Sequence, residues 1–134
     1  MSSFTRNGRG TIRPYIYGPL SLEAFVKTTF AAQEIERNDA PGFLHLEIGI
    51  GDSMLTLSMW KKEPPPGANQ ASTYVYVEDA DATFARALAA GGTSIRAPAD
   101  MHYGERSASV RDEGGNTWFI ATYTGRFTPP GGKK

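Results

Sequence analysis

The feature that most constrains the fold is an internal repeat. A constant offset carries residues 15–17 (YIY) onto residues 74–76 (YVY), and after a small drift residues 51–55 (GDSML) align with residues 115–119 (GNTWF). Each half of the chain is too small to bury a sheet of its own. The repeat therefore predicts two copies of one supersecondary unit that pack together.

Hydrophobic periodicity predicts the same order of elements, β-α-β-β-β, in each half. In the first half we expect strands at residues 11–17, 35–38, 43–50 and 54–60. In the second half we expect strands at residues 73–77, 93–97, 107–111 and 117–123. Pro98 should stop the strand that precedes it. The segment between the halves, residues 61–70, contains Pro-Pro-Pro-Gly and is expected to be a linker.

One helix is expected in each half, after the first strand. Ser21 is placed to cap the first helix, and either Asp79 or Asp81 is placed to cap the second. The apolar positions recur at helical spacing and should form the buried faces. These positions are Leu22, Phe25, Val26 and Phe30 in the first helix, and Ala80, Phe84, Ala87 and Leu88 in the second.

Residues 103–123 read YGERSASVRDEGGNTWFIATY, two strands around a turn rich in glycine and asparagine. This stretch resembles the C-terminal signature of the glyoxalase/bleomycin resistance protein/dioxygenase superfamily (the vicinal oxygen chelate fold), commonly written Y-G-D-R-x-x-x-V-x-D-P-x-G-x-x-W. Glu105 takes the place of the aspartate, and Glu113 takes that of the proline. The histidine-containing strand before Gly-Asp-Ser at residues 51–53 is similar to the phosphonate-operon-associated, or PhnB-like, branch.

The resemblance implies an α+β fold of two tandem β-α-β-β-β modules whose sheets curl around a cavity. The chain then divides into a disordered leader (residues 1–10), a single domain (11–123) and a flexible tail (124–134). Within the domain, module one spans residues 11–60, the linker 61–70 and module two 71–123. Members of this fold commonly dimerise, so we expect a homodimer. The sequence leaves open whether the modules pair within one chain or swap between chains.

The resemblance also gives the positions at which metal-dependent members carry their ligands. These positions fall near Arg13, Leu55, Ser72 and Phe119. None of them offers the carboxylate or imidazole donor that a divalent cation needs, so we expect neither a catalytic metal nor another cofactor. The two histidines, His45 and His102, would bind metal only with partners outside the family geometry, such as Glu47 or Glu105.

Strand alternation places mostly aromatic rings on one surface of the sheets. The residues expected on this cavity side are Tyr15, Tyr17, Tyr74, Tyr76, Phe119 and Tyr123. Residues expected on the other side, under the helices, are Ile16, Val75, Val77, Trp118 and Ile120. Tyrosine supplies an apolar wall and a hydroxyl that orients a ligand, which predicts ligand binding. Alternatively, the rings fill a closed core or the seam of a dimer.

Four further residues are candidates for the ligand site: His45, Glu47, Tyr103 and Arg106. Histidine is the side chain suited to acid–base catalysis at neutral pH, so His45 is the candidate catalyst, the alternative being a partly buried, hydrogen-bonded histidine. Tyr103 and Arg106 should lie at the cavity rim. There Arg106 either clamps a carboxylate or phosphate, or forms an ion pair with Asp112 or Glu105.

Composition narrows the classes of function. The formal net charge is +0, which gives no electrostatic basis for binding nucleic acid or an anionic membrane. The absence of cysteine suits the cytoplasm. We therefore predict a protein that binds a small aromatic or hydrophobic molecule without a catalytic metal. The alternatives are a metal-dependent or acid–base lyase, isomerase or dioxygenase of the same superfamily, and an interaction module without an open cavity.

Overall fold

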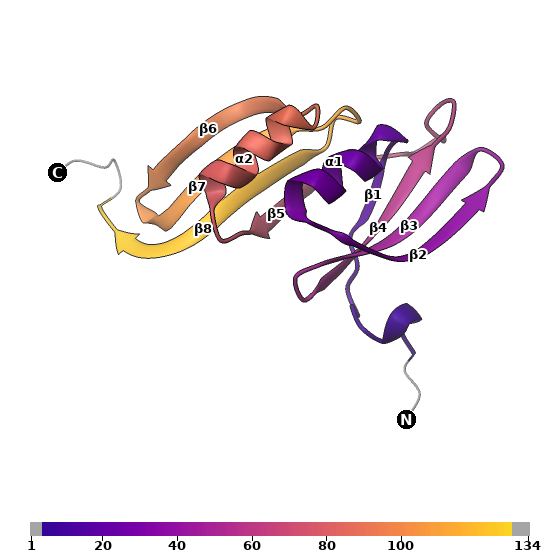
Figure 1. The fold of residues 1–134 in the computed structure, drawn as a ribbon, viewed down its shortest axis with the longest axis horizontal. Helices are drawn as coiled ribbons and strands as arrows, with labels where there is room; N and C mark the ends of the chain where they lie inside the picture. The colour runs from indigo at the N-terminus through magenta and orange to yellow at the C-terminus, as the bar shows by residue number, and fades with distance from the viewer. Residues whose placement is uncertain (1–3, 130–134) are drawn as a thin grey trace.

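The computed structural model describes residues 4–129 and contains two modules of the same design (Figure 1). Module one has a short 3₁₀ turn, η1 (Arg6–Gly8), then β1 (Tyr15–Pro19), α1 (Ser21–Phe30), β2 (Gln33–Ala40), β3 (Phe43–Ile50) and β4 (Ser53–Trp60). Module two has β5 (Ser72–Tyr76), α2 (Ala80–Ala89), β6 (Thr93–Met101), β7 (Tyr103–Arg111) and β8 (Thr117–Phe127). The disorder expected for residues 1–3 and 130–134 lies outside the described residues.

Each module forms its own four-stranded mixed sheet. The strand order is β1-β4-β3-β2 in module one and β5-β8-β7-β6 in module two. In both sheets the first strand of the module runs parallel to the last, with Tyr15 opposite Thr56 and Tyr74 opposite Phe119, and the other pairs are antiparallel. The predicted α+β fold of two tandem β-α-β-β-β modules is therefore confirmed.

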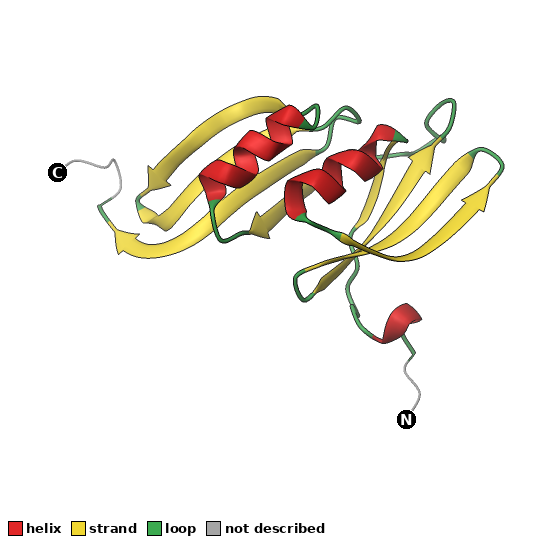
Figure 2. Ribbon diagram, in the orientation of Figure 1, coloured by secondary structure: helices red, strands yellow, loops and turns green. Residues whose placement is uncertain are grey.

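The two modules pack together through their helices. Helices α1 and α2 lie side by side in the middle of the molecule, with one sheet on each side (Figure 2). Trp118 of module two packs against Phe25 and Phe30 of α1, with ring centroids 6.1 and 5.4 Å apart. Its indole N–H donates to Asp112 at 2.8 Å, which satisfies the polar end of a fully buried ring. The two modules thus share one core.

The predicted alternation of the first and last strands is confirmed. Four apolar residues on the helix side are buried: Ile16, Val75, Trp118 and Ile120. Their neighbours along the strands point away from the core, and four tyrosines retain large exposed fractions. These are Tyr15 (51%), Tyr74 (45%), Tyr76 (60%) and Tyr123 (62%). The tyrosines are therefore not core residues of this chain.

Several local expectations were wrong. Ser21 does not cap α1, because its hydroxyl donates instead to Glu113 of the turn before β8. Pro98 does not end β6, which continues to Met101 because register shifts on this edge strand accommodate the proline. Leu88 lies on the exposed side of α2. The expected Asp79 cap is present and accepts a hydrogen bond from the N–H of Ala82 at 3.0 Å.

The chain before β1 packs against module one. We call residues 5–13 the N-terminal strap. Its 3₁₀ turn is fixed to β2, since Arg6 forms an ion pair with Glu36 at 2.8 Å and Asn7 donates to the same carboxylate at 3.2 Å. At the other end of the domain, β8 continues to Phe127, beyond the expected end at Tyr123. No helix among the described residues is long and apolar enough to span a membrane.

Candidate functional site

Each sheet has one surface covered by the helices and one surface opposite to them. We call the surface opposite the helices in module one the module-one face. Its residues are Tyr15, Tyr17, His45, Glu47, Thr56 and Ser58. The corresponding surface of the other sheet is the module-two face. Its residues are Tyr74, Tyr76, Tyr103, Glu105, Phe119 and Tyr123. The ring contacts among the tyrosines of residues 4–129 all stay within one module.

The module-two face is built from aromatic rings that lean on one another. Tyr74 stacks on Phe119 of the adjacent strand, with ring centroids 5.6 Å apart and planes inclined by 22°. Tyr74 also contacts Tyr76 at a centroid distance of 5.5 Å. Because these rings support each other and remain exposed, they present a preformed apolar wall.

Glu105 lies within this aromatic surface and is 92% buried, since only 8% of the residue is exposed. Tyr74 donates its hydroxyl to one carboxylate oxygen, and Tyr76 donates to the other at 2.5 Å. Burial, followed by the hydrogen bond to Glu105, raises the pKa of Tyr74. The hydrogen bond to Glu105 is the main cause that raises the pKa of Tyr76. Both phenols therefore stay protonated and donate to the carboxylate at neutral pH.

Two more tyrosines lie close to this carboxylate. Tyr103 contributes to the raised pKa of both Tyr74 and Tyr76, and Tyr123 contributes to that of Tyr76. Tyr123 is the partner of Glu105 in the β7–β8 pairing. The register of β7 against β8 shifts between Tyr103 and Glu105. Gly104 lies at this shift with a φ of +87°, a value that favours glycine. Four tyrosines thus gather around one carboxylate.

The module-one face also contains a buried glutamate, but its surroundings are polar. Glu47 accepts from the guanidinium of Arg13 at 2.8 Å and from the hydroxyl of Thr56 at 2.7 Å. The Arg13 and Glu47 side chains are only 13% and 11% exposed, so this is a largely buried ion pair. It compensates the charge of Glu47 within the chain.

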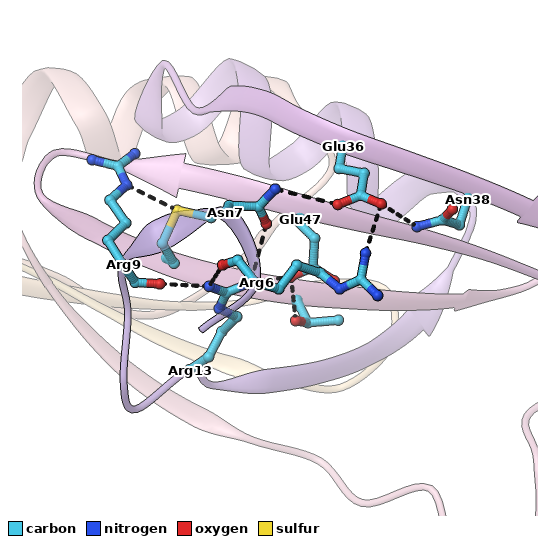
Figure 3. A network of polar contacts seen from close by, with 9 residues as sticks. Arg6, Asn7, Arg9, Arg13, Glu36, Asn38 and Glu47 are labelled. Atoms are coloured by element: carbon cyan, nitrogen blue, oxygen red, sulfur yellow. Dashed lines mark hydrogen bonds and ion pairs between the residues drawn. The ribbon is translucent and has the colours of Figure 1, made fainter. Parts of the chain in front are cut away.

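Arg13 also holds the N-terminal strap over this end of the module-one face (Figure 3). Its guanidinium donates to the carbonyl oxygens of Arg6 and Arg9, each at 2.6 Å. The Arg9 guanidinium lies over β3, where a Cβ on Gly49 would come within 2.8 Å of it, and contacts the sulfur of Met54 at 3.2 Å. The strap therefore covers part of the surface with the protein's own side chains.

His45 lies on the module-one face beside Tyr15, with ring centroids 6.4 Å apart. It shares a hydrogen bond of 3.0 Å with Ser58 on the adjacent strand. Its ring also stacks with Phe43 at a centroid distance of 6.1 Å. The geometry is that of a partly buried histidine with a hydroxyl partner, the second of the two interpretations considered from the sequence.

Arg106 lies away from the tyrosines. Its guanidinium binds both carboxylate oxygens of Asp81 in α2, at 3.0 and 3.1 Å, and reaches Asp100 at 3.4 Å. Because Asp81 belongs to the helix layer, Arg106 is turned to the side of β7 opposite Glu105. The expected ion-pair partners, Asp112 and Glu105, were wrong.

The positions implied for the family metal do not fit a divalent cation. The sheet register corrects one placement: Thr56, and not Leu55, occupies the position equivalent to Phe119, while Leu55 belongs to the core. Thr56 is engaged by Glu47, and Arg13 is a cation. Within residues 4–129, no three or more His, Cys, Asp or Glu side chains are grouped so as to hold a metal ion. We therefore assign no metal-dependent step.

A broad open cleft of about 1150 Å³ borders module two along β5. It is lined by Tyr74 and Tyr76, by the end of α1 and by the turn between β3 and β4. Among the described residues β5 pairs only with β8, so its other edge is free along this cleft. β1 is likewise an edge strand of its sheet.

The fold is that of a protein built from two tandem β-α-β-β-β modules. The comparison of the sequence with family models identifies the family. A model of the Glyoxalase/Bleomycin resistance protein/Dioxygenase superfamily matches residues 24–120, well over half of the chain. The chain belongs to this superfamily. No curated protein matches it in sequence.

Solved structures with a similar fold include TioX, the antibiotic binding protein TnmS3 and the fosfomycin resistance protein FosX. TioX from Micromonospora sp. ML1 has a TM-score of 0.65 and 21% identity, over 83% of this chain and 98% of TioX. TnmS3, an antibiotic binding protein from Streptomyces sp. CB03234, has a TM-score of 0.61 and 20% identity, over 85% and 97%. The fosfomycin resistance protein FosX from Listeria monocytogenes has a TM-score of 0.64 and 15% identity, over 86% and 94%.

Sequence reasoning missed two features of these surfaces. Glu105 was considered as a substitution, as a possible metal partner of a histidine and as a possible partner of Arg106, although strand alternation from its partner Tyr123 would have placed it among the rings. The role of Arg13 was also missed, because a contact between the residues before β1 and Glu47 on β3 has no local sequence signal.

Proposed function

We propose that this protein binds a small aromatic or hydrophobic molecule on its tyrosine-lined sheet surfaces, without the family's catalytic metal. The observation that carries the proposal is the exposed ring array of the module-two face. Tyr76 and Tyr123 are 60% and 62% exposed, yet each belongs to a regular strand beside other rings. Flat ligands gain apolar contact and hydrogen-bond partners on such a surface.

The relatives support a binding function. TnmS3 is described as an antibiotic binding protein and FosX as a fosfomycin resistance protein. The residues at the family's metal positions support a metal-free mode of binding, because Phe119 and Thr56 offer a ring and an engaged hydroxyl. The protein would sequester its ligand in the cytoplasm and release it unchanged.

The proposal includes a homodimer whose modules pair between chains. The free edges of β1 and β5 support this, because within residues 4–129 the two sheets do not join along them. A second copy placed along the cleft beside β5 would bring its own module-one face toward Tyr74 and Tyr76. Sedimentation equilibrium is expected to give twice the chain mass. A monomer at all concentrations would argue against pairing of modules between chains.

The direct test is a titration with a panel of flat aromatic compounds, followed by recovery of the ligand. We expect saturable binding with a shift in melting temperature, and chromatography should return the compound unchanged. No thermal shift with any compound would count against the proposal. Elemental analysis of protein purified without chelators provides the second test, because stoichiometric iron, nickel, manganese or zinc would contradict metal-free binding.

A second candidate function is acid–base catalysis at His45. The observation that favours it is the hydrogen bond between His45 and Ser58 on the same surface as Tyr15 and Tyr17. If a turnover is found with any ligand of the panel, His45→Ala should abolish it. An unchanged rate in that variant would remove the catalytic role and leave binding as the function.

A further inference from the structure

Glu105 combines burial with the lack of a counter-cation. Only 8% of the residue is exposed, and within residues 4–129 it forms no ion pair. Its polar partners are the hydroxyls of Tyr74 and Tyr76. Phenol donors stabilise a carboxylate by hydrogen bonding but leave its charge in place, so this site keeps a negative potential.

The arginines of β6 and β7 that could neutralise Glu105 are engaged by other groups. Arg96 of β6 donates to the carbonyl oxygen and the hydroxyl of Ser107, both at 2.9 Å, and contacts the sulfur of Met101 at 3.5 Å. The other cation of β7, Arg106, is held by Asp81 on the helix side. Neither guanidinium forms an ion pair with Glu105.

The tyrosine rings around Glu105 favour a cationic ligand group, as the charge of Glu105 does. Tyr74, Tyr76, Tyr103 and Tyr123 are all at least 40% exposed, so their ring surfaces are accessible. The face of a tyrosine ring attracts a cation, and clusters of such rings bind alkylated ammonium groups. A carboxylate at the base of the cluster adds a direct charge interaction with a bound cation.

We infer that the module-two face binds an alkylammonium group, with Glu105 as its counter-ion and the surrounding tyrosines as the walls that contact its methyl or methylene groups. The inference rests on the proposed function and narrows it. The ligand is an aromatic or apolar molecule that carries a protonated or quaternary amine. The amine would sit beside Glu105, and the apolar body would lie along Tyr74 and Phe119, which stack on each other.

Glu47, the buried glutamate of module one, is not expected to bind a cationic ligand. Glu47 already has the Arg13 guanidinium at 2.8 Å, and the N-terminal strap lies over it. An added cation there would have to displace a buried ion pair. The preference for a cationic group is therefore expected from Glu105 and not from Glu47.

The test uses three probes that share one ring and differ in charge: benzyltrimethylammonium, benzyl alcohol and benzoate. Dissociation constants are measured by ligand-observed NMR titration on the full chain. We expect benzyltrimethylammonium to bind about tenfold more tightly than benzyl alcohol, and benzoate to bind most weakly. In Glu105→Gln the preference for benzyltrimethylammonium over benzyl alcohol should fall to about twofold.

Glu63→Gln is the matched control, because Glu63 is exposed in the linker and the substitution changes the net charge by the same amount. It should retain the full preference for the cation. Loss of the preference in this control as well would overturn the inference, since overall charge would then be the cause.

The remaining outcomes also separate the two proposals. Equal binding of the cationic and neutral probes by the wild-type protein overturns the inference and leaves the proposed function standing. No binding of any probe overturns both. If Glu105→Gln fails to fold, the dissociation constants of the three probes with the wild-type protein still show whether the cationic probe is preferred. Tyr76→Phe then provides a second variant, which keeps the ring, removes one donor to Glu105 and should retain the preference for the cation.

Discussion

Each module places a buried glutamate on the sheet surface opposite the helices, and the two glutamates are stabilised in different ways. Glu47 of module one is paired with Arg13, while Glu105 of module two is held by the hydroxyls of two tyrosines. The sheets have the same strand order, so the difference does not come from the backbone. The difference comes from the side chains around each glutamate, which are an arginine in module one and tyrosines in module two.

The segment before the first strand of each module accounts for much of this difference. Module one is preceded by the N-terminal strap, whose Arg13 closes onto Glu47 (Figure 3). The repeat offset places Ser72 at the corresponding position of module two, and Ser72 is exposed. Module one therefore satisfies its own polar surface, whereas module two presents accessible rings around a carboxylate. A duplicated unit can thus divide structural and binding roles between its copies.

The largest effect that tests this comparison is expected for Arg13→Met. The substitution leaves Glu47 buried without its counter-cation and removes the donor to the carbonyls of Arg6 and Arg9. We expect the free energy of unfolding, measured by urea denaturation, to fall by about 3 kcal/mol. Arg111→Met is the control, because Arg111 is exposed and forms no ion pair among the described residues.

The cause of this loss can be isolated by combining Arg13→Met with Glu47→Gln. Removing the charge of Glu47 should make the arginine substitution less destabilising, because no buried carboxylate is then left unpaired. If Arg13→Met costs no more than Arg111→Met, or costs the same with and without Glu47→Gln, the ion pair does not stabilise module one as described.

The second largest effect is expected on ligand binding by the module-two face. Tyr76→Ala removes an exposed ring and one donor to Glu105. We expect the dissociation constant for benzyltrimethylammonium to rise about tenfold, while the free energy of unfolding changes by less than about 1 kcal/mol. Tyr15→Ala removes an exposed tyrosine ring from the module-one face and should weaken binding less. A larger effect of Tyr15→Ala would reverse the comparison.

The smallest effect is a pH dependence confined to the outer edge of module one. Hydrogen bonds from Arg37 and Lys27 lower the pKa of Glu34 to about 2, from an ordinary value of 4.5. Because the folded-state pKa is the lower one, Glu34 contributes stability above about pH 4.5, and this contribution disappears as the pH falls toward 2. Glu34→Gln should lower the urea midpoint slightly at pH 6.

At pH 2 the wild-type protein and Glu34→Gln should have the same urea midpoint, because Glu34 has lost most of its charge advantage there. A difference between the two proteins that persists unchanged at pH 2 would show that the substitution acts through packing and not through the charges of Lys27 and Arg37.

The sequence predicts the fold well because its strongest signals are periodic and local. Alternation in β1, β5 and β8 separates buried Ile16 and Val75 from the tyrosines on either side of them, and buried Trp118 from Phe119. The Asp79 cap depends on a hydrogen bond only three residues away. The predicted Ser21 cap was wrong because the hydroxyl of Ser21 donates to Glu113, which is distant in sequence, and not to a group of its own helix.

The candidate site is harder to predict because its chemistry depends on contacts between strands. Periodicity identifies the rings of Tyr74 and Tyr76, but it does not reveal that their hydroxyls converge on Glu105. The partner of Arg106 likewise follows from the position of α2 over β7, which brings Asp81 within reach. Register also decides the equivalence of Thr56 with Phe119, which the alignment of residues 51–55 with residues 115–119 displaced by one residue.

The most direct test of the central claim is ¹⁹F NMR of protein labelled with 3-fluorotyrosine and titrated with benzyltrimethylammonium. The chain has six tyrosines, two on the module-one face and four around Glu105. We predict saturable shifts that are largest for Tyr74, Tyr76, Tyr103 and Tyr123. Shifts that are largest for Tyr15 and Tyr17, or no saturable shift at any tyrosine, would contradict the assignment of ligand binding to module two.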